Sequence, residues 1–242
     1  MEQTNNPFGG LDTTGLEAPR DTLGGGGALE SGVYDGVIKL AYAGVSRNGA
    51  RSLTIHLDIN GREYRETLYV TNREGKNYYE RNKKKNPLPG FTVANDLALL
   101  TTGLPLSEQD IEERVVKLYD FDAKAEVPTK VLAVISLHGK PVKVGIIKEI
   151  VDKNVKNGAG EYVPSGETRE QNTIDKVFHA ETGKTVAEYT NKVEKAEFIH
   201  KWEERNKGQT RDRSTAGGAK TGVPGLKSPA DTGKPQTKSL FG

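Results

Sequence analysis

The chain has 242 residues, of which 28% are charged and 34% hydrophobic, and its formal net charge is +2. It contains no cysteine, which excludes a disulfide framework and a cysteine-ligated zinc site. No apolar run approaches the roughly 18 residues that a membrane-spanning helix needs, and the first residues lack the apolar core of a signal peptide. We therefore expect a soluble protein of a reducing compartment, the cytoplasm.

The charges are distributed unevenly along the chain. Residues 1–30 carry five acids and one base (net −4), residues 205–242 carry eight bases and two acids (net +6), and the middle is neutral. Both ends are rich in glycine or polar residues and poor in the apolar residues that offset the entropy of ordering. We predict a flexible N-terminal arm over residues 1–30 and a disordered basic tail over residues 207–242.

Apolar residues that recur at every second position begin after the N-terminal arm. Residues 32–45 and 51–59 read as strands, and residues 62–70 continue the pattern. In residues 51–59 the apolar side chains lie on one face, and Ser52, Thr54, His56 and Asp58 lie on the other. Asn60-Gly61 separates the second and third runs, and such a pair is typical of a type I′ hairpin turn.

A helix and further strands follow this hairpin. A helix beginning at Thr92 or Asn95 and ending at Gly103 is predicted, and the runs 114–121, 128–137 and 141–151 read as extended. Because helices do not alternate with strands, a parallel sheet is disfavoured. The order predicts a mainly β, OB-fold-like antiparallel barrel with a helical insertion over residues 31–152. An SH3-like barrel or a small sandwich is the alternative.

Residues 153–206 are predicted to be a loop and helix extension that packs on the barrel. The first 20 residues read as a long loop, and a short hairpin is expected around Thr182-Gly183. Residues 193–206 read as a C-terminal helix, in which Phe198, Ile199 and Trp202 belong to an apolar stripe at helical spacing.

Basic and aromatic residues gather in and around the segment "NYYERNKKKNPLPGF" (77–91). Single-stranded nucleic acid is bound by positive grooves that follow the phosphates and by aromatic faces that stack on bases. In an OB-fold the ligand lies over the second and third strands and the loops beside them, and His56 would face it from the second strand. The candidate residues are Arg47, Arg51, Arg62, Arg65, Tyr69, Arg73, Lys76, Tyr78, Tyr79, Arg81, Lys83, Lys84 and Lys85. Tyr64 and Phe91 are expected in the core instead.

Motifs of common enzymes are missing from the sequence. There is no phosphate-binding glycine loop and no nucleophile elbow, and the four histidines are scattered. Residues 126–130 only loosely match the carboxylate and lysine spacing of a metal-dependent nuclease. We expect no catalytic residue, no metal and no cofactor.

Three segments together resemble the phage single-stranded DNA-binding proteins of the OB-fold type: "GVYDGVIKLAYAG" (32–44), "NYYERNKKKNPLPGF" (77–91) and "KLYDFDAKAEVPTKV" (117–131). The resemblance implies a protein that coats single-stranded DNA in replication, recombination or repair, in the cytoplasm of a bacterial host. Such proteins commonly end in an acidic tail with an aromatic residue near its tip, which binds partner proteins. Here the tail is basic and only Phe241 matches, so a tail that binds replication or transcription proteins and a tail that adds DNA affinity both stay open.

Two other functions remain as alternatives. The first is a protein-bridging or transcription accessory module, in which a barrel and its arms connect partner proteins. The second, less favoured, is a metal-dependent nuclease.

Overall fold

The computed structural model describes residues 27–120, 123–158 and 162–215. The predicted N-terminal arm up to residue 26, the tail from residue 216 onward and Phe241 therefore lie outside the described residues. The strands are β1 (Gly32–Val45), β2 (Arg51–Ile59), β3 (Arg62–Tyr69), β4 (Tyr78–Arg81), β5 (Lys84–Pro87), β6 (Ile111–Asp120), β7 (Ala125–Val134), β8 (Pro141–Lys156), β9 (Tyr162–Phe178) and β10 (Thr210–Asp212). The helices are α1 (Pro89–Thr102), α2 (Val186–Thr190) and α3 (Phe198–Asn206), with 3-10 turns η1 (Leu106–Glu108) and η2 (Ile135–Leu137).

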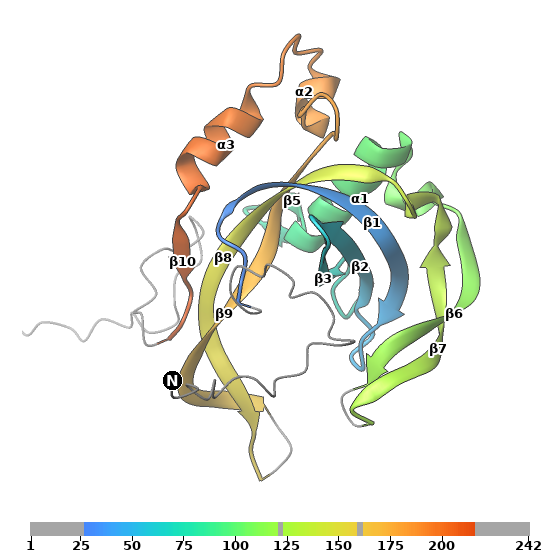
Figure 1. Cartoon of the computed structure of the whole chain (residues 1–242), viewed down its shortest axis with the longest axis vertical. Coiled ribbons are helices and arrows are strands. Elements are labelled where there is room, and N and C mark those ends of the chain that lie inside the picture. The colour runs from blue at the N-terminus through green and yellow to red at the C-terminus, as the bar shows by residue number, and fades with distance from the viewer. Residues whose placement is uncertain (1–26, 121–122, 159–161, 216–242) are drawn as a thin grey trace, which may run out of the picture.

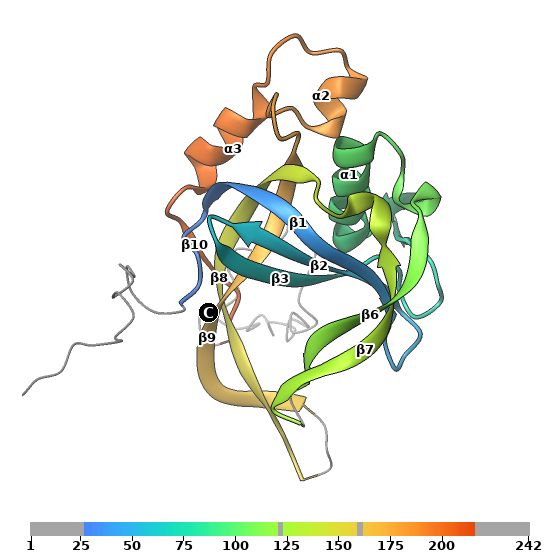
Figure 2. The ribbon, with the colours of Figure 1, turned by 45° about the vertical axis from the view of Figure 1, so that its right-hand side comes forward.

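The predicted fold class is confirmed: the protein is mainly β, its long strand pairings are antiparallel, and α1 is inserted between the strands. The long strand β1 joins the parts of the sheet. Its first half pairs with β8, its second half pairs with β2, and Tyr42 and Ala43 also pair with β7. The sheet bends but does not close, because β3 and β10, the two ends of its strand order, do not pair with each other within the described residues. The hairpins β6–β7 and β8–β9 extend to the same side of β1–β3, downward in Figures 1 and 2.

The β2–β3 hairpin forms as the sequence predicts. Asn60 and Gly61 have φ values of 53° and 80°, the left-handed pair that a type I′ turn requires, and Ile59 pairs with Arg62 beside them. This turn sets the register, so Leu57 lies opposite Tyr64 and Leu53 opposite Leu68 on the core face. Tyr64 is buried, as expected.

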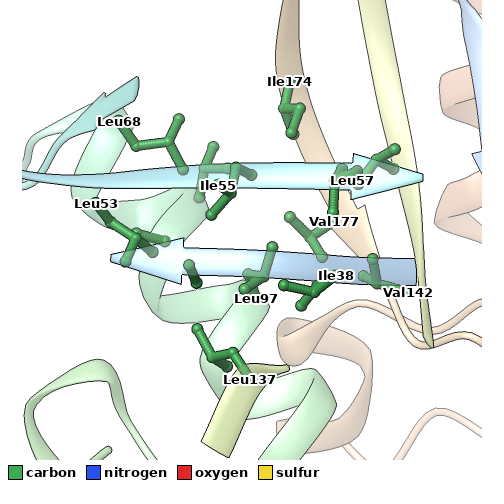
Figure 3. Packing of buried hydrophobic residues seen from close by; sticks show 14 of the residues in the cluster. Ile38, Leu53, Ile55, Leu57, Leu68, Leu97, Leu137, Val142, Ile174 and Val177 are labelled. Atoms are coloured by element: carbon green, nitrogen blue, oxygen red, sulfur yellow. The ribbon is translucent and has the colours of Figure 1, made fainter. Parts of the chain in front are cut away.

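The core lies between this face and α1. Leu97 of α1 is fully buried against the apolar side chains of β1, β2, β8 and β9, as Figure 3 shows. The helix begins at Pro89, earlier than Thr92 or Asn95, because proline is suited to the first turn of a helix, where its missing N–H is not needed. It ends at Gly103, whose φ of 81° is the left-handed conformation of a helix terminus.

The prediction of a long loop over residues 153–172 is wrong in part. Residues 153–156 complete β8, and residues 162–178 form β9. The outer half of this ribbon is exposed on both faces, so its sequence carries no apolar alternation that would indicate a strand. The predicted hairpin at Thr182-Gly183 is a turn before helix α2, which begins with a capping box between Thr185 and Glu188.

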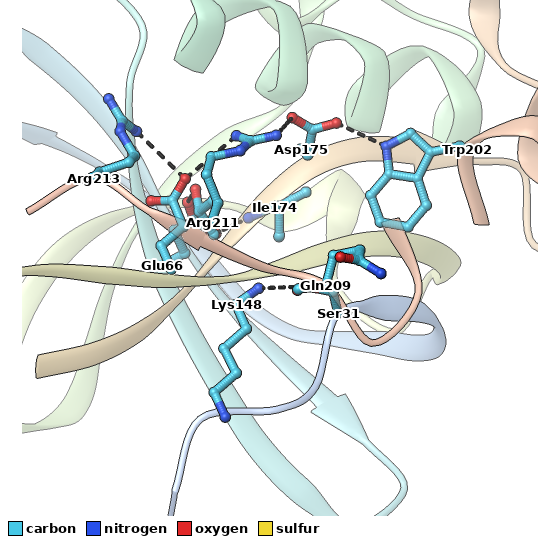
Figure 4. A network of polar contacts seen from close by, with 11 residues as sticks. Ser31, Glu66, Lys148, Ile174, Asp175, Trp202, Gln209, Arg211 and Arg213 are labelled. Carbon is cyan, nitrogen blue, oxygen red and sulfur yellow. Dashed lines mark hydrogen bonds and ion pairs between the residues drawn. The ribbon is translucent and has the colours of Figure 1, made fainter. Parts of the chain in front are cut away.

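The predicted C-terminal helix begins at Phe198 and not at residue 193, and it packs on the sheet through Trp202. The indole is 4% exposed and lies against Ile147 and Phe178, with Ile199 beside it. Its Nε1 donates a hydrogen bond to Asp175 at 2.8 Å, which Figure 4 shows. Phe198 is 38% exposed, so it contributes less of the contact than the sequence suggests.

The first residues of the predicted disordered tail are ordered and pair with β8. Strand β10 lies parallel to β8, and Arg211 and Arg213 reach Glu149, with Nη1 to Oε1 distances of 3.4 and 3.5 Å. Glu149 is only 1% exposed. A buried carboxylate needs opposite charges close by, so the two arginines account for the ordered start of this segment.

Glu66 is a second carboxylate held inside the fold, here partly buried, and it allows a prediction on pH. Its Oε2 accepts hydrogen bonds from the Tyr64 hydroxyl at 2.6 Å and the Ile174 N–H at 2.8 Å, and its Oε1 accepts one from Thr173 at 3.0 Å. Burial raises the pKa of the Glu66 carboxyl above its ordinary value, against the lowering effect of these bonds. A raised pKa in the folded state means that this group stabilises the fold fully below its ordinary pKa and less as the pH rises.

Glu66→Gln should therefore raise the thermal unfolding temperature near neutral pH and leave it unchanged below the ordinary glutamate pKa. The amide oxygen keeps the bonds from Tyr64 and Ile174, and the amide N–H₂ can donate to the Thr173 hydroxyl. Unfolding temperatures of both proteins across the acid and neutral range measure the difference. A variant that is less stable than the parent at every pH would show that the ionised carboxylate stabilises the fold.

Candidate nucleic-acid interface

Two loops meet at the end of the sheet where β3 finishes. The turn between β1 and β2 is closed by the Ser46 N–H to Ala50 O bond of 2.8 Å, and Arg51 donates its backbone N–H to the Thr71 hydroxyl at 2.9 Å. A Cβ on Gly49 would lie 3.5 Å from the Arg73 carbonyl oxygen, so the turn rests against the loop after β3. The structure therefore brings Arg47, Arg51 and Arg73 into one region.

The segment that gives the strongest sequence signal is a hairpin and not a loop. Strands β4 and β5 pair in antiparallel fashion, and Asn82 and Lys83 form the turn with φ values of 52° and 59°. Because Arg81 pairs with Lys84 and Tyr79 with Asn86, the side chains of Tyr79, Arg81 and Lys84 share one face.

The two adjacent tyrosines face opposite sides of this hairpin. Tyr78 shares its face with Lys85, whose ammonium nitrogen lies 4.6 Å from the centre of the phenol ring. Such a contact is a cation–π interaction, so Lys85 already covers one face of the Tyr78 ring. Tyr79 is 45% exposed, on the face of Arg81 and Lys84.

The hairpin is fixed to the end of β3 through the start of α1. A Cβ on Gly90 would lie 2.4 Å from the Tyr69 carbonyl oxygen, so only glycine allows this approach. The Leu88 N–H bonds to the Asn77 carbonyl at 2.9 Å and closes the base of the hairpin. The 54% exposed Tyr69 ring thus stands on the strand end that holds the hairpin.

We call residues 46–51 and 69–88 the basic end of the sheet. They contain eight bases and two acids, a net charge of +6 against +2 for the whole chain. All eight basic side chains are exposed. Lys76 forms an ion pair with Glu74 at 2.8 Å, which reduces its share of the local field. Phosphates are attracted to such a concentration of exposed positive charge.

The outer face of β2 and β3 is less open than the sequence suggests. Thr54 and His56 are 5% and 9% exposed, because β2 is a central strand and larger neighbouring side chains lie over it. Arg65 of β3 donates to the Tyr42 hydroxyl of β1 at 3.1 Å, across β2. The exposed part of the outer face consequently lies on β3 and consists of Glu63, Arg65, Thr67 and Tyr69.

His56 is a buried polar residue for which the sequence gives only a weak signal, its place on the polar face of β2. Its Nδ1 lies 2.6 Å from Glu63 Oε1, and its ring is 5.9 Å from that of Tyr42. Its Nε2 is buried without a hydrogen-bond partner, alone among the buried side-chain polar atoms of the described residues. A pocket of about 300 Å³ opens beside it, lined by Lys39, Asp58 and Glu63 among others. An unsatisfied buried nitrogen is a place where a ligand atom can bond.

Arg62 lies apart from the other candidates. It begins β3 next to the Asn60-Gly61 turn, at the opposite end of the strand from Tyr69, and its guanidinium donates to the Gly27 carbonyl. It thus holds the segment before β1, and the structure does not bring it to the basic end.

Comparison with protein-family models and with curated proteins gave no match for this chain. Within the described part of the chain, no helix is long and apolar enough to cross a membrane. In the same residues, no cluster of three or more histidine, aspartate or glutamate side chains is arranged to hold a metal ion.

Proposed function

We propose that this protein binds single-stranded DNA with little sequence preference and protects or presents it during DNA replication, recombination or repair. The observation that carries the proposal is the basic end of the sheet, where a net charge of +6 surrounds the exposed rings of Tyr69 and Tyr79. Positive charge alone suits any nucleic acid. Exposed aromatic faces beside it suit single strands, because bases within a duplex are already stacked on one another.

The proposed binding uses two kinds of contact. Arginine and lysine side chains of the two loops and the β4–β5 hairpin hold the phosphates, and the tyrosines stack on bases. Stacking contributes roughly 1 to 3 kcal/mol per base and accepts every base, because each has a π-face. The exposed Arg65 extends the contacts along β3.

A fluorescence titration with an oligo-dT strand at two salt concentrations tests the proposal. Binding that weakens with salt, with similar affinity for mixed-sequence strands and lower affinity for a duplex, is the expected result. Absence of binding at low salt would overturn the proposal and favour the protein-bridging alternative. Mg²⁺-dependent shortening of the strand would favour the nuclease.

The two tyrosines of the hairpin should respond differently to substitution. Tyr79→Ala is expected to weaken oligonucleotide binding by roughly 1 to 3 kcal/mol, the size of one stacking contact. Tyr78→Ala should cost less, because Lys85 already covers that ring. Tyr79→Phe is the matched control, since it keeps the aromatic face. Neither alanine variant should change the salt dependence of binding. Equal losses of affinity from both would mean that Tyr79 is not the preferred stacking residue of the hairpin.

A further inference from the structure

Strand β6 is an open edge of the sheet. Within the described residues it pairs with β7 alone, and it forms the outer rim of the molecule in Figures 1 and 2. The Ile135 N–H bonds to the Asp110 carbonyl at 3.0 Å, and the hydrogen-bonded pairs of the ladder follow from this bond in steps of two. Pro128, which has no N–H, lies opposite Lys117 in a pair that needs none. The backbone N–H and C=O groups of Glu113, Val115 and Lys117 therefore point away from β7, toward the open edge.

The odd-numbered residues of β6 include large apolar side chains, which are unusual at an exposed edge. Ile111, Val115 and Tyr119 are 53%, 63% and 48% exposed, and Leu132 of β7 adds a fourth large apolar side chain that is 52% exposed. Glu113 and Lys117 stand between the apolar residues. Long edges with exposed apolar side chains are templates for pairing with another strand.

The sequence of this edge is complementary to itself. We propose that β6 pairs in antiparallel fashion with β6 of a second copy of this chain, with Val115 facing Val115 across a two-fold axis. In this register Glu113 lies opposite Lys117 of the second copy and Lys117 opposite its Glu113, while Ile111 meets Tyr119. Opposite charges and apolar pairs directly across a ladder stabilise it, and a closed two-fold contact is the commonest form of protein association.

Neighbouring registers are worse. The open backbone groups belong to odd-numbered residues, so only shifts that keep odd-numbered residues opposite one another form hydrogen bonds. Shifting the axis to Glu113 places two glutamates face to face, and shifting it to Lys117 places two lysines face to face. An axis at residue 114 sets Ile111 against Lys117, and an axis at residue 116 sets Glu113 against Tyr119. Only the Val115 axis gives two ion pairs.

Charge reversals at the two positions provide the test. Glu113→Lys places two lysines opposite each other at both contacts of its own dimer, and Lys117→Glu does the same with glutamates. Each variant alone should dimerise about tenfold or more weakly than the parent, because like charges directly across a ladder repel. A mixture of the two variants restores both opposite-charge contacts and should form a heterodimer.

Sedimentation of the full chain without DNA, over a range of protein concentrations, measures this. The expected pattern is a parent dimer, two weakened single variants and a restored mixture. Glu113 also forms an ion pair with Lys130 of β7 at 2.9 Å, which Glu113→Lys removes. Because Glu113, Lys117 and Lys130 are all exposed, and exposed pairs contribute little, thermal unfolding of the variants should stay close to that of the parent. A monomeric parent at all concentrations, single variants that dimerise like the parent, or a mixture that stays monomeric would each overturn the proposal. These outcomes are independent of the oligonucleotide titration.

Discussion

Replacing Lys83, Lys84 and Lys85 with alanine should weaken oligonucleotide binding about a hundredfold at roughly 0.1 M salt. The three side chains are exposed on the turn and second strand of the β4–β5 hairpin. For single strands, the logarithm of affinity falls by about 0.7 per neutralised phosphate for each tenfold rise in salt. The loss of three contacts should therefore reduce this slope by about two units, and the defect should shrink as salt is raised.

A variant with the same charge change elsewhere separates local contacts from net charge. Three lysines lie on or beside α3: Lys195, Lys201 and Lys207. Helix α3 packs near the first half of β1, whereas the basic end of the sheet lies beyond the last residues of β1. Alanine at these three positions should leave the affinity and the salt slope close to those of the parent. Equal losses in both triple variants would mean that only overall charge matters. A hairpin variant with unchanged affinity and slope would place the DNA surface on Arg47, Arg51 and Arg65 instead.

The sequence predicts the fold well where a short pattern has a single physical solution. Asn60-Gly61 between alternating runs determines the β2–β3 hairpin, and the apolar face of β2 identifies the core. Strand β9 and the outer end of β8 cannot be recognised from the sequence, because both faces of the outer half of this ribbon are solvated and no period-2 signal exists. Its strands are long because they hydrogen-bond to each other, which composition does not reveal.

The candidate site could be predicted in composition but not in arrangement. The basic and aromatic content of residues 77–91 is visible in the sequence, yet the Asn82-Lys83 turn decides which side chains share a face. The burial of His56 depends on Tyr42 from β1 and on Arg65 from β3, which meet only in the folded sheet. Similarly, Arg211 and Arg213 belong to a segment that reads as disordered until Glu149 is known to be buried beside them.

Trp202→Ala should destabilise the fold by roughly 3 to 5 kcal/mol, the usual cost of truncating a buried tryptophan. The indole fills the space between α3 and the sheet against Ile147 and Phe178, and its N–H satisfies Asp175. In a folded unit of this size each kcal/mol lowers the unfolding temperature by about 2 to 4 °C, so a loss on the order of 10 °C is expected. Trp202→Phe keeps much of the apolar contact and loses the hydrogen bond. Its unfolding temperature should fall between those of the parent and of Trp202→Ala. Phe198→Ala, on the same helix but more exposed, is the control and should cost much less.

A second substitution shows whether this loss comes from the contact with the sheet. A Cβ on Gly145 would lie 2.9 Å from Cζ2 of Trp202, and the rigid ring has no flexible end that could move aside. Gly145→Ala should therefore destabilise the parent by about 1 to 3 kcal/mol through overpacking. In the Trp202→Ala background the methyl group enters vacated space and should be neutral or stabilising. The two substitutions are thus expected to be strongly non-additive in thermal unfolding. Oligonucleotide binding should be unchanged in every folded variant of the set, because none of these residues lies at the basic end. Additive losses of stability would mean that α3 does not rest on β8 through this ring.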